Sequence, residues 1–236
     1  MNTPPGRPPG EALQASFKFA KAPDRFATID AASANQAAID FLKRVGDWPV
    51  ATACLIGPPR SGRSTLARAW AHSQGGLCLT PQTLLGQAEP LGGSERALAV
   101  DPADEGLPET VLLGLINQAG ERGGRLLLTA SAPPLAWPVE SRDLASRLVS
   151  LPLAEIESPD RETVGIRLYS LLKRHFEAPP MDVVRYLEQR LQRTYEDIEA
   201  CAMRLAGAVG SGQALTVLLA SRILAEMYGP EDTSDG

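Results

Sequence analysis

The sequence lacks the features that define several large classes of protein. Its 236 residues contain no apolar run of the ~18 residues that a membrane span requires, and the first residues carry no signal-peptide core. The three cysteines, Cys54, Cys78 and Cys201, are scattered through apolar stretches, which excludes a disulfide scaffold and favours a reducing cytoplasm. Excess basic charge is also missing. With 23 Lys and Arg against 28 Asp and Glu, the net charge of −5 argues against DNA binding by phosphate neutralisation.

What remains is the composition of a folded protein, with 44% hydrophobic and 22% charged residues. The first ten residues are rich in Pro and Gly, which favours extended backbone, so residues 1–22 are predicted to form a flexible tail. We expect two further units, an α/β domain over 23–156 and a helical lid over 157–236.

Five short apolar runs predict the strands of one sheet. They are Val50–Ile56, Gly76–Thr80, Arg96–Asp101, Arg125–Thr129 and Leu148–Ile156. One pattern of helical period, at 34–45, precedes these runs, and two others, at 64–73 and 108–118, lie between them. This alternation predicts a parallel sheet with crossover helices, the α/β class.

Beyond residue 156 the apolar period is helical throughout. Ser158 and Pro159 are typical of a helix start, with Ser as the cap and Pro in the first turn. Apolar residues at three- and four-residue steps predict four helices, and the segment carries more acidic than basic side chains. We therefore expect no sequence-specific DNA binding from it.

The strongest local motif follows the first predicted strand and precedes a helical pattern. It runs Gly57, Pro58, Pro59, Arg60, Ser61, Gly62, Arg63, Ser64, Thr65. Glycines let the backbone turn its N–H groups inward, and the helix beginning near Arg63 offers its positive end to a phosphate. These residues, 57–65, predict a phosphate loop for ADP or ATP, with Ser64 as a ligand of Mg²⁺. The alternative is a strand-to-helix turn without a ligand.

Two positions differ from the residues that are usual in an efficient ATPase. Arg63 stands where Lys is usual, and its planar fork does not reproduce the point contact of an ammonium group. Asp101 ends the third predicted strand, where a carboxylate can hold Mg²⁺ through water, but Pro102 follows it in place of a second acid. We expect nucleotide binding with slow or no turnover. A simpler role for Asp101 is to cap a turn.

Two later polar residues have both a functional and a structural interpretation. Ser131 follows the fourth predicted strand, where it would sense a γ-phosphate or simply form a turn. Arg147 precedes the fifth strand, where it would reach a partner's nucleotide as an arginine finger or pair with a nearby carboxylate on the surface.

The order of these motifs resembles that of the DnaA-type AAA+ replication initiators over residues 25–227. The match adds three boxes to the phosphate loop and the acid-terminated strand, at Leu128–Pro134, Leu144–Leu148 and Ile156–Thr163. The resemblance implies an AAA+ P-loop module, a five-stranded parallel sheet with a C-terminal helical lid. DnaA initiators carry a helix-turn-helix domain after the lid, and the chain ends at Gly236 without residues for one. It is thus similar to the short Hda-type regulators.

Those regulators act with the sliding clamp to make DnaA hydrolyse its ATP. The resemblance therefore implies two partners, the clamp and DnaA, and a role for Arg147 as the finger in trans. It also implies a clamp-binding peptide, for which Gln14, Phe17 and Phe19 match the pattern, with Phe17 in place of Leu. An extended peptide with aromatic anchors suits an apolar groove, although both Phe residues would also suit the protein's own core. Self-association is a further possibility.

In the lid, the position where the family often has a sensor arginine is occupied by Glu196, with Arg193 and Arg204 as the nearest cations. Two other functions stay open on the residues alone: a self-sufficient P-loop ATPase or kinase, and an AAA+ structural adaptor without nucleotide. His72 and His175 lie far apart and predict no metal site or general base. The tryptophans, Trp48, Trp70 and Trp137, are expected in or beside the core.

Overall fold

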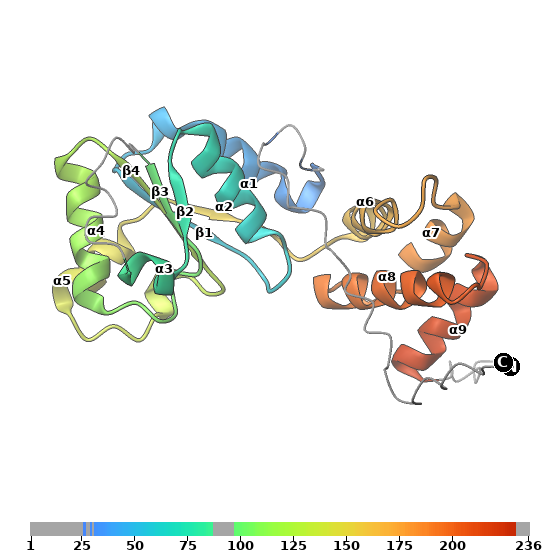
Figure 1. Ribbon diagram of the computed structural model, residues 1–236. Helices are drawn as coiled ribbons and strands as arrows, with labels where there is room; N and C mark the ends of the chain where they lie inside the picture. Colours follow the sequence, from blue (N-terminus) through green and yellow to red (C-terminus); the bar gives the residue numbers. More distant parts are fainter. Residues whose placement is uncertain (1–25, 27–28, 30, 87–96, 230–236) are drawn as a thin grey trace, which may run out of the picture.

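The computed structural model describes residues 26, 29, 31–86 and 97–229. Its elements form two units in contact, a sheet with helices on both faces and a helical lid (Figure 1). The strands are β1 (Thr52–Ile56), β2 (Leu77–Leu79), β3 (Ala97–Val100), β4 (Arg125–Ala130) and β5 (Leu153–Glu155). All pair in parallel in the order β2-β3-β4-β1-β5, which confirms the predicted α/β class. No helix in these described parts is long and apolar enough to cross a membrane.

The two faces of the sheet are covered by different helices. One face packs against α4 (Glu109–Glu121) and α5 (Arg142–Val149), and the other against α1 (Ser33–Lys43) and α2 (Arg63–Ser73). A short helix, α3 (Pro81–Leu85), follows β2, and two 3-10 turns lie at Val45–Asp47 and Pro134–Ala136. Along β1 the side chains alternate between the two cores, as a pleated strand requires. Burial from both sides explains why the strands read as continuous apolar runs.

Trp70 contributes the largest fully buried side chain, stacked on Trp48 at 5.6 Å. Trp48 in turn stacks on Phe41 at 5.4 Å, and this aromatic row joins α1 to α2 beneath the sheet. Trp137 is buried against the opposite face. The expectation that all three tryptophans pack in the core is confirmed.

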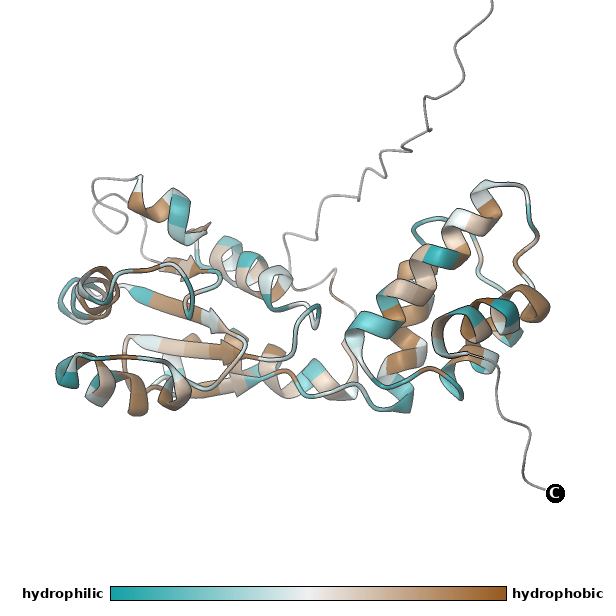
Figure 2. Ribbon diagram, turned by 90° about the horizontal axis from the view of Figure 1, so that it is seen from below, coloured by the Kyte–Doolittle hydropathy of each residue, from teal (hydrophilic) through white to brown (hydrophobic). Residues whose placement is uncertain are grey.

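The lid consists of α6 (Arg161–Leu172), α7 (Met181–Glu188), α8 (Tyr195–Gly210) and α9 (Val217–Tyr228). These helices bury a core of their own, visible as brown inward faces in Figure 2. The first turn of α8 also reaches the α/β unit. There Tyr195 packs in the core beneath α1 and α2 and donates a 3.0 Å hydrogen bond to the carbonyl of Glu157.

Two predicted boundaries are wrong. The fifth apolar run was expected to be a strand from Leu148, but Leu148 and Val149 end α5. Leu144 and Leu148 stand one helical turn apart and both bury against the sheet, which is the helical period. The start of α6 also differs, because Asp160 rather than Ser158 is the cap. Its carboxylate accepts a 2.8 Å hydrogen bond from the Thr163 backbone.

Candidate functional site

The predicted phosphate loop, residues 57–65, connects β1 to the start of α2 (Figure 1). Gly62 has a φ of +102° and caps α2, accepting a 2.9 Å hydrogen bond from the Leu66 amide. Arg60 also has a positive φ, +60°, which is uncommon for a residue with a side chain. The first N–H groups of α2, at Arg63, Ser64 and Thr65, have no carbonyl acceptor within the helix and lie at its positive end.

Gly57 allows the loop to lie tightly against the end of β5. A Cβ atom at Gly57 would come within 2.9 Å of the Ile156 Cβ and 3.0 Å of the Ser61 Oγ. No other residue fits this contact without moving the backbone. Packing alone therefore requires glycine at this position.

Two side-chain atoms of the loop are buried and have no hydrogen-bond partner among the described residues: Ser61 Oγ and Arg63 Nη1. Buried polar atoms are nearly always hydrogen-bonded in folded proteins. Phosphate oxygens would accept from both donors, and the free amides of α2 would bind the same anion. This donor set fits a nucleoside di- or triphosphate.

Two carboxylates lie where β3 and β4 end. Asp101 accepts a 2.5 Å hydrogen bond from the buried Thr129 hydroxyl. Asp104 accepts from both the backbone N–H and the hydroxyl of Ser131, at 2.8 and 2.7 Å. Thr129 was not among the predicted site residues. Ser131, expected near the phosphates, is exposed and paired with Asp104.

A backbone hydrogen bond holds the segment that carries Asp104 at the end of β4. The Ala103 amide donates a 2.7 Å hydrogen bond to the Thr129 carbonyl, which turns the chain back across the strand ends. Burial raises the pKa of the Cys54 thiol in β1 to about 12, with the Asp104 charge adding to this shift and the Arg63 charge opposing it. Asp104 and Arg63 are therefore both close enough to Cys54 for their charges to act on it.

A second set of charges joins the loop to the lid. Arg60 Nη1 donates to a Glu199 carboxylate oxygen on α8 at 2.7 Å, and this bond raises the pKa of the Arg60 guanidinium. On α6, Arg167 Nη2 lies 3.4 Å from the other Glu199 oxygen and 3.4 Å from the Arg60 carbonyl. We call these three residues the loop–lid cluster.

The sequence analysis missed Arg167 and Glu199. The one signal available was a charged residue between Ile166 and Leu168 on a helix that is otherwise apolar there. The family pattern points instead to Glu196, with Arg193 and Arg204 as the nearest cations. Glu196 is exposed at the start of α8, and Arg204 lies 4.0 Å from Glu226 of α9.

Arg147, the predicted arginine finger, lies in the last turn of α5, before β5. Its side chain is 43% exposed and its Nε atom donates a 3.2 Å hydrogen bond to Asp143 one turn earlier. The structure thus shows the surface pair that was the alternative interpretation, in a position open to a partner. The clamp-peptide residues Gln14, Phe17 and Phe19 lie outside the described residues.

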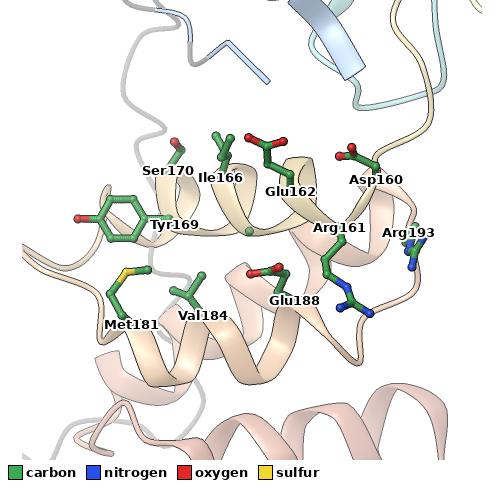
Figure 3. A pocket seen from close by; sticks show the side chains of 11 residues that line it. Asp160, Arg161, Glu162, Ile166, Tyr169, Ser170, Met181, Val184, Glu188 and Arg193 are labelled. Atoms are coloured by element: carbon green, nitrogen blue, oxygen red, sulfur yellow. The ribbon is translucent and has the colours of Figure 1, made fainter. Parts of the chain in front are cut away.

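A separate groove of about 830 Å³ lies on the lid between α6 and α7. Met181, Val184 and Glu188 project from α7 toward α6 (Figure 3). Gly165 of α6 lets this contact form, because a Cβ there would lie 2.9 Å from a Glu188 oxygen. The groove is lined by lid residues and by Asp160 and does not include the phosphate loop.

Nothing in the described ranges resembles a metal centre built from protein ligands alone. No group of three or more His, Cys, Asp or Glu side chains is placed to hold a metal ion within those ranges. His72 and His175 are both exposed and far apart in the chain. Any Mg²⁺ at the loop would therefore depend on nucleotide oxygens together with Ser64 and a carboxylate.

A scan of the sequence against protein-family models and a search of curated proteins each found no match. Solved structures do resemble the chain. Domain III of the replication initiation protein DnaA from Thermotoga maritima aligns with a TM-score of 0.72 at 16% identity, covering 87% of this chain and 97% of that one. AMPPCP-bound DnaA from Aquifex aeolicus gives 0.61 at 16% identity, over 76% of this chain and 64% of that one.

The likeness extends to other AAA+ proteins. The Thermotoga maritima RuvB Holliday junction branch migration motor aligns with a TM-score of 0.61 at 14% identity, covering 89% of this chain and 76% of that one. The FIGL-1 AAA domain in complex with ADP gives 0.59 at 16% identity, over 84% and 80% of the two chains. At these low sequence identities the comparisons establish only the fold. The chain has a DnaA-like AAA+ fold, a five-stranded parallel sheet with a helical lid.

Proposed function

We propose that this chain regulates replication initiation by docking on the sliding clamp and stimulating ATP hydrolysis by DnaA, with Arg147 as an arginine finger in trans. The observation that carries the proposal is the fold, which matches DnaA domain III over nearly the whole of that domain. AAA+ modules of one fold can place a side chain of one subunit beside the nucleotide of the next. The Leu144–Leu148 box puts Arg147 on an exposed helix end.

Arg147 is free to change partners at little cost. Its pair with Asp143 is an exposed i,i+4 contact, a kind that contributes only about 0.3–0.5 kcal/mol. A guanidinium that leaves this carboxylate for a triphosphate would gain charge-assisted hydrogen bonds. Charge stabilisation of this kind accelerates phosphoryl transfer by about 10³–10⁵ elsewhere.

A nucleotide bound to this chain itself would have a structural and regulatory role. Residues 57–65 would hold ADP or ATP, with Ser64 and Asp101 near Mg²⁺, and the bound phosphates would supply an anion between the loop and the lid. Efficient turnover is not expected, because Pro102 follows Asp101 and the Asp101 carboxylate already accepts the Thr129 hydroxyl. A general base needs hydrogen-bond reach of the attacking water.

Docking on the clamp would use Gln14, Phe17 and Phe19. An extended peptide with two aromatic anchors fits an apolar groove. A pull-down with sliding clamp, comparing wild type with Gln14→Ala, tests this part separately. Failure of the wild type to bind would remove the clamp from the proposal.

The central test is ATP hydrolysis by DnaA in the presence of clamp loaded on DNA. The wild-type chain should stimulate hydrolysis, Arg147→Ala should lose the stimulation, and Arg142→Ala, an exposed arginine of the same helix, should keep it. Both variants should bind clamp as the wild type does. Full stimulation by Arg147→Ala would exclude the finger role.

A second candidate is an ATPase that acts alone, and Asp104 favours it. Its carboxylate lies at the end of β4, paired with Ser131, and its charge acts on Cys54 of β1 as the Arg63 charge does. This candidate predicts turnover by the isolated chain well above that of Arg63→Ala, and a loss of turnover in Asp104→Asn. Equal, negligible rates in all three proteins would leave the regulatory role.

A further inference from the structure

Arg167 lies where the lid meets the phosphate loop. It projects from α6, and its Nη2 atom is 3.4 Å from the carbonyl of Arg60, a residue of the loop itself. The side chain is 29% exposed, so it lies partly within the boundary between the two units. This contact joins residues 107 positions apart in the chain.

Few of the N–H donors of Arg167 have a good hydrogen-bond acceptor. Its two contacts are both long at 3.4 Å, and its Nε atom is buried without a hydrogen-bond partner in the described parts of the chain. A guanidinium offers five N–H donors, and leaving one buried and unsatisfied is costly. A ligand with several acceptor oxygens between loop and lid would satisfy it.

The acceptor now present is shared. The Glu199 carboxylate accepts hydrogen bonds from Arg60 at 2.7 Å and from Arg167 at 3.4 Å, so one carboxylate is shared by two guanidinium groups. The loop–lid cluster thus holds two guanidinium groups against one shared carboxylate, and the charge of Glu196 also acts on Arg60. Phosphate oxygens at the loop would offer Arg167 the acceptors that the shared carboxylate does not.

The other charged residues in and before α8 do not provide a cation at the loop. Glu196 is a carboxylate, and Arg204 is engaged with Glu226 on the side of α9. Arg193 lines the groove between α6 and α7 instead. Arg167 is thus a lid cation, among the residues that the structure describes, with a direct hydrogen bond to the loop.

We propose that Arg167 binds the phosphates of a nucleoside di- or triphosphate held by residues 57–65, and that Glu199 competes with those phosphates for it. The proposal rests on the proposed function only in requiring that the loop bind nucleotide. Phosphate binding would exchange the long contact to Glu199 for charge-assisted hydrogen bonds. The lid would then close on the ligand through α6 rather than through the start of α8.

The two partners in this pair have opposite expected effects. Arg167→Gln removes the cation and should weaken ADP binding about tenfold or more, the value of one charge-assisted hydrogen bond. Glu199→Gln removes the competitor, frees Arg60 and Arg167, and should strengthen ADP binding. If the pair only fastened the lid to the loop, both substitutions would weaken binding.

The experiment is a titration of the full chain with a fluorescent ADP analogue, followed by displacement with unlabelled ADP and with inorganic pyrophosphate. Wild type, Arg167→Gln, Arg167→Lys and Glu199→Gln are compared with Arg204→Ala, a lid arginine away from the loop. The proposal expects weaker binding of ADP and pyrophosphate by Arg167→Gln, partial recovery in Arg167→Lys, tighter binding by Glu199→Gln, and no change in Arg204→Ala. Circular dichroism establishes that each variant is folded.

Several results would overturn the proposal. Unchanged ADP affinity in Arg167→Gln, weakening by both Arg167→Gln and Glu199→Gln, or a loss confined to ADP with pyrophosphate unaffected would each exclude a phosphate contact. A wild type that binds neither ADP nor pyrophosphate would remove the nucleotide role of the loop as well. That result differs from the first three, in which the loop binds nucleotide and Arg167 makes no contact with its phosphates.

Discussion

The Thr129 hydroxyl donates a hydrogen bond of 2.5 Å to the Asp101 carboxylate, across the carboxyl ends of β4 and β3. Thr129 is fully buried, whereas Asp101 is partly exposed beside it. The pair fixes the orientation of a carboxylate at the edge of the sheet where the predicted phosphate loop also leaves β1. A buried hydroxyl therefore determines what Asp101 can reach.

Replacing Thr129 by Val keeps the shape of the side chain and removes this donor. The expected cost is about 1.5–3 kcal/mol of unfolding free energy, the range for a hydrogen bond to a charged group. Urea denaturation measures it. Thr110→Val, at an exposed position of α4, is the control and should change the free energy by less than about 0.5 kcal/mol.

The same pair can be tested by a double-mutant cycle. Asp101→Asn with Thr129→Val should cost less than the sum of the single variants, because residues in one hydrogen bond couple by about 0.5–3 kcal/mol. Additive costs would show that Thr129 stabilises the strand end through packing and not through Asp101.

The sheet could be predicted because its strands are buried on both faces. Such strands read as short apolar runs, and each observed strand coincides with one of them, β4 running one residue further to Ala130. The turn that connects β1 to α2 could also be predicted, since a glycine-rich segment between strand and helix is a local pattern. The fifth run was too long because an apolar helix end, Leu148, stands directly before the strand, and apolarity alone does not separate the two.

The contacts of the site could not be read from the sequence in the same way. Arg167 and Glu199 meet Arg60 only because the lid folds back onto the loop, and no local period encodes a contact over more than one hundred residues. Asp104 does not directly follow Asp101 in the sequence, so its place at the strand ends is not evident from its position. A backbone hydrogen bond from Ala103 to Thr129 brings it back to the strand ends, and turns of this kind depend on tertiary structure.

Gly76 is predicted to be irreplaceable for packing. A Cβ atom there would lie 2.0 Å from the Ala97 carbonyl oxygen of β3, a backbone atom that cannot move without disturbing the sheet. Gly76→Ala should cost about 3 kcal/mol of unfolding free energy or prevent folding. Gly114→Ala, at an exposed position in the interior of α4 with nothing within 4 Å of the added atom, should instead stabilise by about 0.5–1 kcal/mol. Equal effects at the two positions would contradict the close approach of Gly76 to β3.

The cysteines are predicted to be unreactive in the folded protein. Burial raises the pKa of Cys54 and Cys201 to about 12 and that of Cys78 to about 11. At pH 8 only about one Cys54 thiol in ten thousand would be ionised, and the thiolate is the reacting form. Reaction with an aromatic disulfide reagent should be slow for the native protein and fast in urea, and the half-buried Cys78 should react before the other two. Rapid labelling of Cys54 in the native state would contradict the packing of β1.

Asp160 is predicted to make the stability of the lid depend on pH. Hydrogen bonds from Thr163 and from the Ser33 hydroxyl lower the pKa of Asp160, so the folded state binds its proton less tightly than the unfolded state. The stabilisation is therefore complete above the unfolded pKa of about 4 and is lost as pH falls through the lower folded pKa.

Asp160→Ala should cost about 1 kcal/mol of unfolding free energy at pH 7, as loss of a helix cap does, and less near pH 2. Asp160→Asn keeps an acceptor that does not titrate, so its difference from Asp160→Ala should stay constant with pH. Urea unfolding followed by circular dichroism at both pH values measures these differences, and a cost of Asp160→Ala that does not change with pH would show that the cap acts without its charge.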